Sequence, residues 1–112
     1  MTDRLSIKNL DAPTLQRLHD ALLNQGLLIE AGWVSLRIAA IPPDAPEVQL
    51  EEMRNAFFAG AKHLFSSIMI VLDPGSEEPT AADMARMDKI QRELDAYIQT
   101  FALRRLPTEG CA

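Results

Sequence analysis

The chain has 112 residues, of which 47% are hydrophobic and 24% are charged, and its net charge is −5. This length suits one domain with a modest core, and the composition excludes an intrinsically disordered chain. Acids outnumber bases 16 to 11, which argues against general nucleic-acid binding, because proteins that track phosphates need clustered Lys and Arg. We therefore expect a single globular domain over residues 1–112.

The cysteine and histidine content argues against an internal disulfide and a structural metal site. Cys111 is the only cysteine, and His19 and His63 are the only histidines, so no Cys and His pair has the spacing of metal ligands. We expect no metal, no cofactor and a reducing, cytoplasmic location. The N-terminus lacks the pattern of a signal peptide, and no apolar run reaches the roughly 18 residues of a membrane span.

Residues 11–25 predict the first helix. Asp11 is a suitable N-cap residue, and Pro13 falls in the first turn, where its missing N–H costs nothing. Leucines then recur at helical spacing until Gly26, a residue that commonly follows the last turn of a helix.

Residues 27–41 are ambiguous, because their apolar positions fit both the alternation of a strand and two adjacent helical stripes. We favour a helix, since the chain offers no second strand for pairing and an isolated strand leaves its backbone groups without partners. Pro42 and Pro43 end the segment in either case.

Two long helices are predicted next, over residues 47–72 and 80–105, with a proline-containing turn between them. Thr80 can cap the second helix, with Asp83 as its partner in a short capping box. Residues 106–112 form a tail. The pattern as a whole predicts an all-α fold, in which a long antiparallel helical hairpin joins shorter N-terminal helices in an oligomeric helical bundle.

The helix at 47–72 has an unusually wide apolar surface. Its two apolar stripes together span about half of the circumference at roughly 100° per residue, and a single neighbouring helix covers only a narrow seam. We therefore expect a homo-oligomer, a dimer or higher, because a self-complementary patch generates a two-fold interface. The expected interface residues are Phe58, Phe65 and Met69 of this helix, with Trp33 from the preceding segment.

Arg54 lies between the two apolar stripes, where a guanidinium without a partner is costly. In one interpretation it reaches water or pairs with a nearby carboxylate such as Glu51 or Glu93. In the other it forms an anion site in which Arg54 and Arg104 bind phosphate and Tyr97 provides an aromatic wall, because guanidinium groups bind phosphate bidentately and aromatic rings stack on bases.

No enzyme signature is found. A magnesium-dependent hydrolase needs paired acids that face each other across a bundle, whereas the acidic pairs here are adjacent in sequence, Glu51–Glu52 and Glu77–Glu78. No serine has an identifiable base, and Cys111 has no histidine neighbour. We expect a protein that is not an enzyme.

The order of elements from Pro42 to Thr100 resembles the small phage proteins that sequester cyclic oligonucleotide signals, the anti-CBASS sponges. The positions that carry the resemblance are Pro42–Pro43, Arg54, Pro74 and Ser76. The family has an aromatic residue and a histidine just before the proline pair, where this chain has Ala40–Ile41. The resemblance implies an interlocked helical oligomer of phage or prophage type that binds a phosphate-bearing cyclic nucleotide.

Two functional hypotheses follow. In the first, the protein is a counter-defence sponge whose interface pockets hold a cyclic nucleotide through Arg54, Tyr97 and Arg104. In the second, it is an interaction module or inhibitor that binds a host or phage protein through an apolar surface on the helix at 47–72 or around Trp33.

Overall fold

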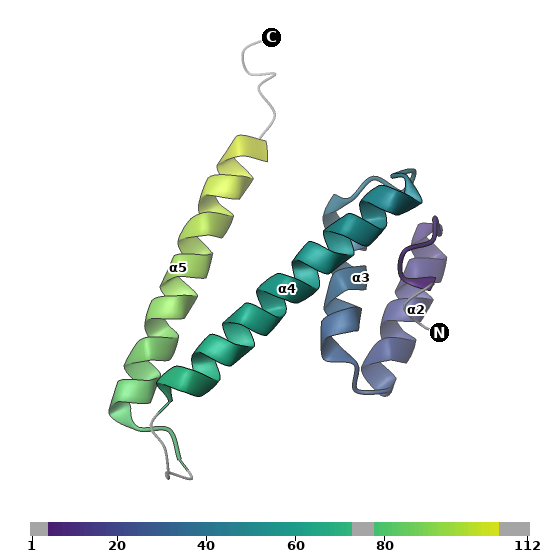
Figure 1. Cartoon of the computed structure of the whole chain (residues 1–112). Coiled ribbons are helices and arrows are strands. Elements are labelled where there is room, and N and C mark those ends of the chain that lie inside the picture. The colour runs from purple at the N-terminus through teal and green to yellow at the C-terminus, as the bar shows by residue number, and fades with distance from the viewer. Residues whose placement is uncertain (1–4, 73–77, 106–112) are drawn as a thin grey trace. The chain divides into compact units, whose positions relative to one another are not determined.

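The computed structural model describes the backbone of residues 5–72 and 78–105, with side chains up to Phe101. Its helices are α2 (Ala12–Asn24), α3 (Leu28–Ala40), α4 (Glu47–Val71) and α5 (Ala81–Arg105) (Figure 1). Within these described ranges there is no strand, which confirms the all-α prediction. The chain divides into two compact units, Met1–Ser66 and Ser67–Ala112, and each is described by itself.

Helix α2 has the local signals that the sequence predicts at both ends. The Asp11 side chain accepts a hydrogen bond from the backbone N–H of Thr14 at 3.0 Å, which confirms Asp11 as the N-cap. At the other end Gly26 has a φ of +77°, and Leu27 N donates to the carbonyl of Leu22 at 2.9 Å. This is a Schellman motif, and its left-handed position explains why glycine follows the last turn.

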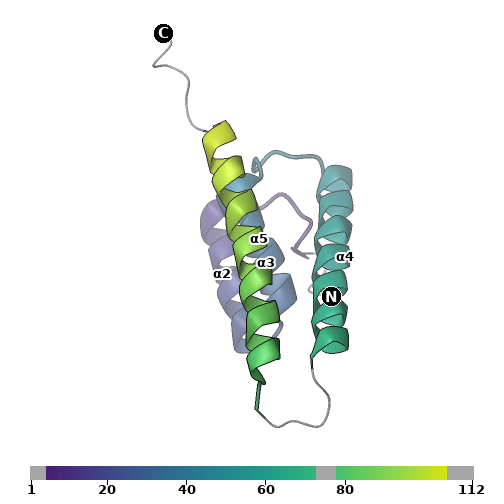
Figure 2. The same cartoon turned by 90° about the vertical axis from the view of Figure 1, so that its left-hand side faces the viewer.

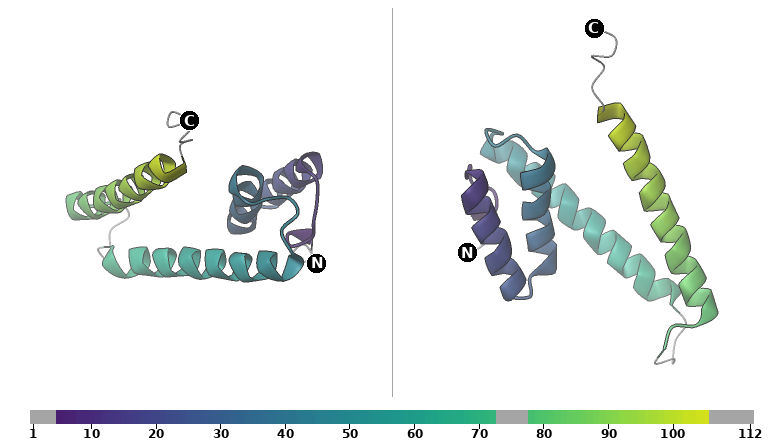
Figure 3. Two further views of the ribbon diagram at one scale, coloured as in Figure 1. Left: turned by 90° about the horizontal axis from the view of Figure 1, so that it is seen from above. Right: turned by 180° about the vertical axis from the view of Figure 1, so that it is seen from behind.

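The segment at 27–41, which the sequence left open between helix and strand, is the helix α3. It lies beside α2, and the two run antiparallel in both views that show them clearly (Figure 1 and the right panel of Figure 3). Ile41 has extended backbone angles, as expected for a residue that precedes Pro42. The short connection at Gly26 therefore folds the two helices into a hairpin.

The core of the first unit is built around the only tryptophan of the chain. Trp33 is 0% exposed, and its indole N–H donates to the carbonyl of Ser6 at 2.9 Å. The expectation that Trp33 belongs to an exposed contact surface is therefore wrong. The Trp33 side of α3 faces the protein, because the indole N–H bonds to the N-terminal segment and the Phe57 ring of α4 lies beside the indole ring. Leu36 and Ile38 of the same helix are exposed. The other buried apolar residues are Leu15, Leu22, Ala31, Val34, Ile41, Ala45 and Leu50.

Helix α4 packs on α3 where α3 lacks a side chain. A Cβ atom added at Gly32 would lie 3.3 Å from the ring of Phe57, so the two helices approach closely at this point. The Phe57 ring also lies 6.1 Å from the ring of Trp33 between centroids, a typical separation for an aromatic pair. By contrast, Gly60 has open space around it. Figure 2 shows α4 as one continuous helix.

The second unit contains the end of α4 and all of α5. Thr80 and Asp83 form the predicted reciprocal cap: Thr80 N donates to Asp83 Oδ2 at 3.1 Å, and Asp83 N donates to Thr80 Oγ1 at 3.0 Å. Arg86 Nη1 also donates to the carbonyl of Val71 at 2.7 Å, which ties the start of α5 to the end of α4. The antiparallel hairpin over the full length of both helices, the single domain and the oligomeric bundle stay predictions.

Several positions singled out from the sequence lie outside the described residues. These are Pro74 and Ser76 in the turn, residues 106–112 with Cys111, and the side chain of Arg104.

Candidate interaction groove

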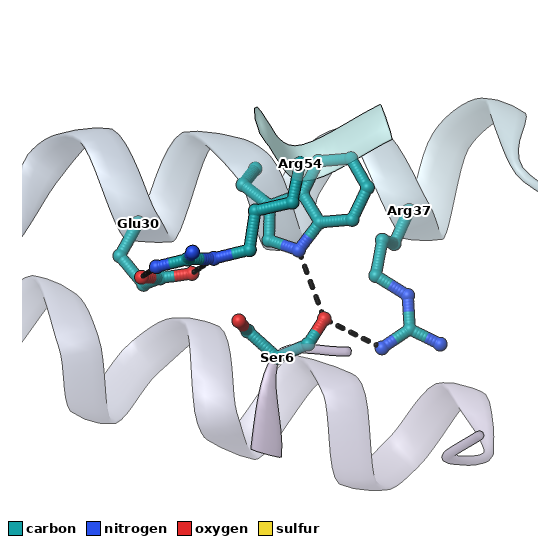
Figure 4. A network of polar contacts seen from close by, with 5 residues as sticks. Ser6, Glu30, Arg37 and Arg54 are labelled. Carbon is teal, nitrogen blue, oxygen red and sulfur yellow. Dashed lines mark hydrogen bonds and ion pairs between the residues drawn. The ribbon is translucent and has the colours of Figure 1, made fainter. Parts of the chain in front are cut away.

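The side chain of Arg54 is held by a carboxylate of the neighbouring helix α3. Its Nε donates to Glu30 Oε2 at 3.0 Å, and its Nη2 donates to Glu30 Oε1 (Figure 4). The two groups therefore form a bidentate ion pair, which is the strongest geometry for arginine and a carboxylate. The side chains are only 21% and 9% exposed, respectively, so the pair is largely shielded from water.

The position of Glu30 explains why this pairing is favourable. Glu30 lies in the first turn of α3, where the helix dipole stabilises a negative charge. The guanidinium carbon of Arg54 also lies 4.5 Å from the centre of the Phe58 ring, a cation–π contact on the same helix. The arginine that looked out of place among apolar residues is thus held by α3 and by its own helix.

This pairing corrects one expectation and changes another. The partner carboxylate is Glu30, and not Glu51 or Glu93. For the predicted anion site, two guanidinium nitrogens of Arg54 already donate to Glu30, so a phosphate would have to displace a buried carboxylate. Tyr97 belongs to the second unit, and the Arg104 side chain is not described. The grouping of these three residues stays a prediction.

A groove opens next to the ion pair and contains two of the predicted interface residues. Its volume is about 690 Å³. The start of α3 forms one wall, and the middle of α4 forms the other. Its lining residues are Gly26, Leu28, Ile29, Phe58, Ala61, Lys62, Phe65 and Ser66. The groove is therefore mostly apolar, with one cation and one hydroxyl from adjacent turns of α4.

The apolar side chains of the groove are accessible. Phe65 is 66% exposed, and Leu28 and Ile29 on the opposite wall are 67% and 46% exposed. Exposed leucines and phenylalanines are common one at a time, but a contiguous set along a groove indicates a contact surface. Phe58 and Phe65 were found from the stripe pattern. The sequence analysis missed Leu28, Ile29 and Glu30, although Glu30 is the only acid between Leu27 and Ile41.

The end of α4 is apolar in several directions. Met69, Ile70 and Val71 follow one another, and three consecutive residues cover about 200° of a helix surface. Met69 is 58% exposed and Ile70 is 81% exposed. Helices that are apolar on all sides are normally buried, so we expect other protein to cover this end of α4.

Helix α5 carries a second exposed apolar face. Leu94, Tyr97, Ile98 and Phe101 recur at helical spacing, and each is at least 39% exposed. The rings of Tyr97 and Phe101 stack, with their centroids 6.4 Å apart. This regular stripe has the geometry of a helix that inserts into a groove.

Among the described residues, no group of three or more His, Cys, Asp or Glu side chains lies close enough together to hold a metal ion. None of the described helices has the length and hydropathy that a membrane crossing requires. Comparison with known proteins finds no matching family model, no matching curated protein and no matching solved structure. Function is therefore inferred from the geometry of this chain alone.

Proposed function

We propose that the protein is a non-enzymatic, self-assembling interaction protein, in which the groove of one subunit receives the apolar face of α5 from a second copy. The observation that carries the proposal is the groove of about 690 Å³ with Phe65 on one wall and Leu28 on the other. A volume in the range of roughly 300–1,000 Å³ is typical of clefts that bind a ligand.

The charges near the two surfaces support this choice of occupant. Lys62 is the charged residue among those that line the groove, and no acid lies among them. On a helical wheel, the α5 stripe is flanked by Glu93 on one side and Asp95 on the other. A helix with this stripe would bring a carboxylate towards Lys62, and such complementarity selects the partner and its register.

The test is the mass of the assembly, measured by native mass spectrometry and by sedimentation at micromolar concentrations. The wild-type chain should form a dimer or a higher oligomer. Phe65→Asp should dissociate it, because a charge would lie in the apolar contact, while far-UV circular dichroism should be unchanged because Phe65 is exposed.

Val48→Asp is the matched control, because Val48 is an equally exposed apolar residue of α4, at 67%, and does not line the groove. This variant should keep the wild-type mass. A wild-type monomer at 100-fold higher concentration would refute self-assembly, as would equal effects of the two variants. A host or phage protein recovered in a fixed ratio with a monomeric chain would instead identify a different occupant of the groove.

The cyclic-nucleotide hypothesis stays a prediction, and the pairing of Arg54 with Glu30 does not favour it. Its test is thermal unfolding in the presence of a panel of cyclic di- and trinucleotides. Binding at about 100 times the dissociation constant would add about 2.7 kcal/mol to the free energy of unfolding. A shift that persists in Arg54→Lys would show that the bidentate guanidinium is not the phosphate ligand.

A further inference from the structure

Arg37 is a buried cation that its surroundings satisfy only in part. The residue is 3% exposed, and its Nη1 donates to the carbonyl of Ser6 at 3.0 Å. Within residues 5–72 and 78–105, its Nη2 is buried and has no hydrogen-bond partner. Figure 4 shows this second nitrogen directed away from Ser6. Arg37 therefore differs from Arg54, whose charge is met by Glu30.

Among the residues that the structure describes, no carboxylate forms an ion pair with Arg37, which is unusual for a buried guanidinium. Burial lowers the pKa of Arg37 below its ordinary value, because the charged form has lost water. Charges of this kind are normally paired, since the loss of hydration costs several kcal/mol per ion. The carbonyl of Ser6 offers a dipole and not a full charge. An anion would complete the environment of Arg37.

The same residue lines a small pocket in the first unit. The pocket has a volume of about 80 Å³ and is formed by the start of α2, the last turn of α3 and the loop that follows. Its lining residues are Ala12, Leu15, Arg37, Ile38, Ile41 and Pro43. One water needs roughly 10–15 Å³, so the pocket can hold a group of several heavy atoms. It shares no lining residue with the groove at Phe65.

The lining defines the chemistry of an occupant. One cation calls for one negative charge, and apart from Arg37 the side chains of the wall are hydrocarbon. Asp11 and Asp44 line the adjoining surface, so they would repel a dianion such as phosphate more strongly than a monoanion. Ala12 is the first residue of α2, and the positive end of that helix dipole favours an anion.

We propose that the Arg37 pocket binds a small aliphatic monocarboxylate, with one carboxylate oxygen on Nη2 of Arg37 and the hydrocarbon part against Leu15, Ile38 and Ile41. Because Nη2 is buried, an occupant has to displace part of the pocket lining to reach it. We expect Ile38 to be the residue displaced, since it is 41% exposed whereas Leu15 and Ile41 are buried. The site is independent of the assembly proposed above.

The probe is isobutyrate, with isobutyramide as a neutral molecule of the same shape and inorganic phosphate as a dianion. The full-length protein is labelled with ¹⁵N, and the side-chain N–H signals of Arg37 are followed as each probe is added. Isobutyrate should shift these signals in a saturable way and raise the thermal midpoint. Isobutyramide and phosphate should do neither. An equal response to isobutyramide, or no saturable response to isobutyrate, would overturn the proposal.

Two variants localise the effect. Arg37→Gln removes the charge and leaves a shorter polar side chain, and it should weaken isobutyrate binding about tenfold or more, as expected for a lost charge-assisted hydrogen bond. Ile38→Phe fills the pocket and leaves Arg37 in place, so it gives a readout even where Arg37→Gln does not fold. Isobutyrate binding that survives Ile38→Phe with wild-type affinity would show that the ligand binds elsewhere.

Discussion

The ion pair between Arg54 and Glu30 allows a quantitative test of how α4 is held to α3. Arg54→Ala would leave the Glu30 carboxylate, whose side chain is 9% exposed, without a cation. Removing one member of a buried pair costs about 3–5 kcal/mol. Because 21% of the Arg54 side chain remains in contact with solvent, we expect the lower end of that range, about 3 kcal/mol.

The assay is urea unfolding followed by far-UV circular dichroism, at one fixed protein concentration so that assembly does not bias the comparison. With a slope of about 1.5 kcal/mol per molar urea, a loss of about 3 kcal/mol moves the midpoint down by roughly 2 M. The slope itself should not change, because the folded surface is the same.

The double variant Glu30→Met with Arg54→Met separates the pair from its packing. Replacing a whole buried ion pair by apolar residues is often neutral or stabilising, so the double variant should be more stable than Arg54→Ala alone. The reasoning is refuted if Arg54→Ala costs less than about 1 kcal/mol, since the median exposed pair contributes no more than that. It is also refuted if the double variant is the least stable of the set.

Two further perturbations test the first unit. Gly32→Leu should lower the thermal midpoint of unfolding by several degrees. Even a Cβ atom at this position would lie 3.3 Å from the ring of Phe57, and overpacking typically costs about 1–3 kcal/mol. Gly60 has open space around it, so Gly60→Leu is the control and should change the midpoint far less. The hydrogen bonds from Thr14 hold the pKa of Asp11 below its ordinary value of 3.8. The cap should therefore stabilise the fold above pH 3.8 and lose its effect as the pH falls through the lowered pKa. The difference in the free energy of unfolding between wild type and Asp11→Ala should shrink on acidification, and a constant difference down to pH 2 would contradict the role of the carboxylate.

Local signals made much of this fold predictable. The Asp11 cap and the Thr80 and Asp83 box each join residues three apart. Helix geometry alone sets such contacts. The turn at Gly26 was predictable in the same way, because the residue with left-handed backbone angles directly follows the last turn of a helix and is usually glycine.

The contacts that define the candidate site are different. Glu30 and Arg54 are 24 residues apart, and a periodic sequence pattern does not predict which of several carboxylates forms an ion pair with a given arginine. Trp33 was assigned to the surface for a related reason: the apolar pattern of its helix does not show which positions are covered. Contacts with Ser6 and Phe57, both distant in sequence, bury this residue. Long-range packing, and not local propensity, placed these residues.

The burial of Trp33 in the first unit has a practical consequence when it is set beside Tyr97 in the second. The chain has one tryptophan and one tyrosine, and the boundary at Ser66 and Ser67 separates them. Each half thus has its own intrinsic chromophore. Indole emission will report on the first half alone, whereas far-UV circular dichroism reports on the helices of both. A melt followed by both signals therefore distinguishes one shared transition from two separate ones without any added label.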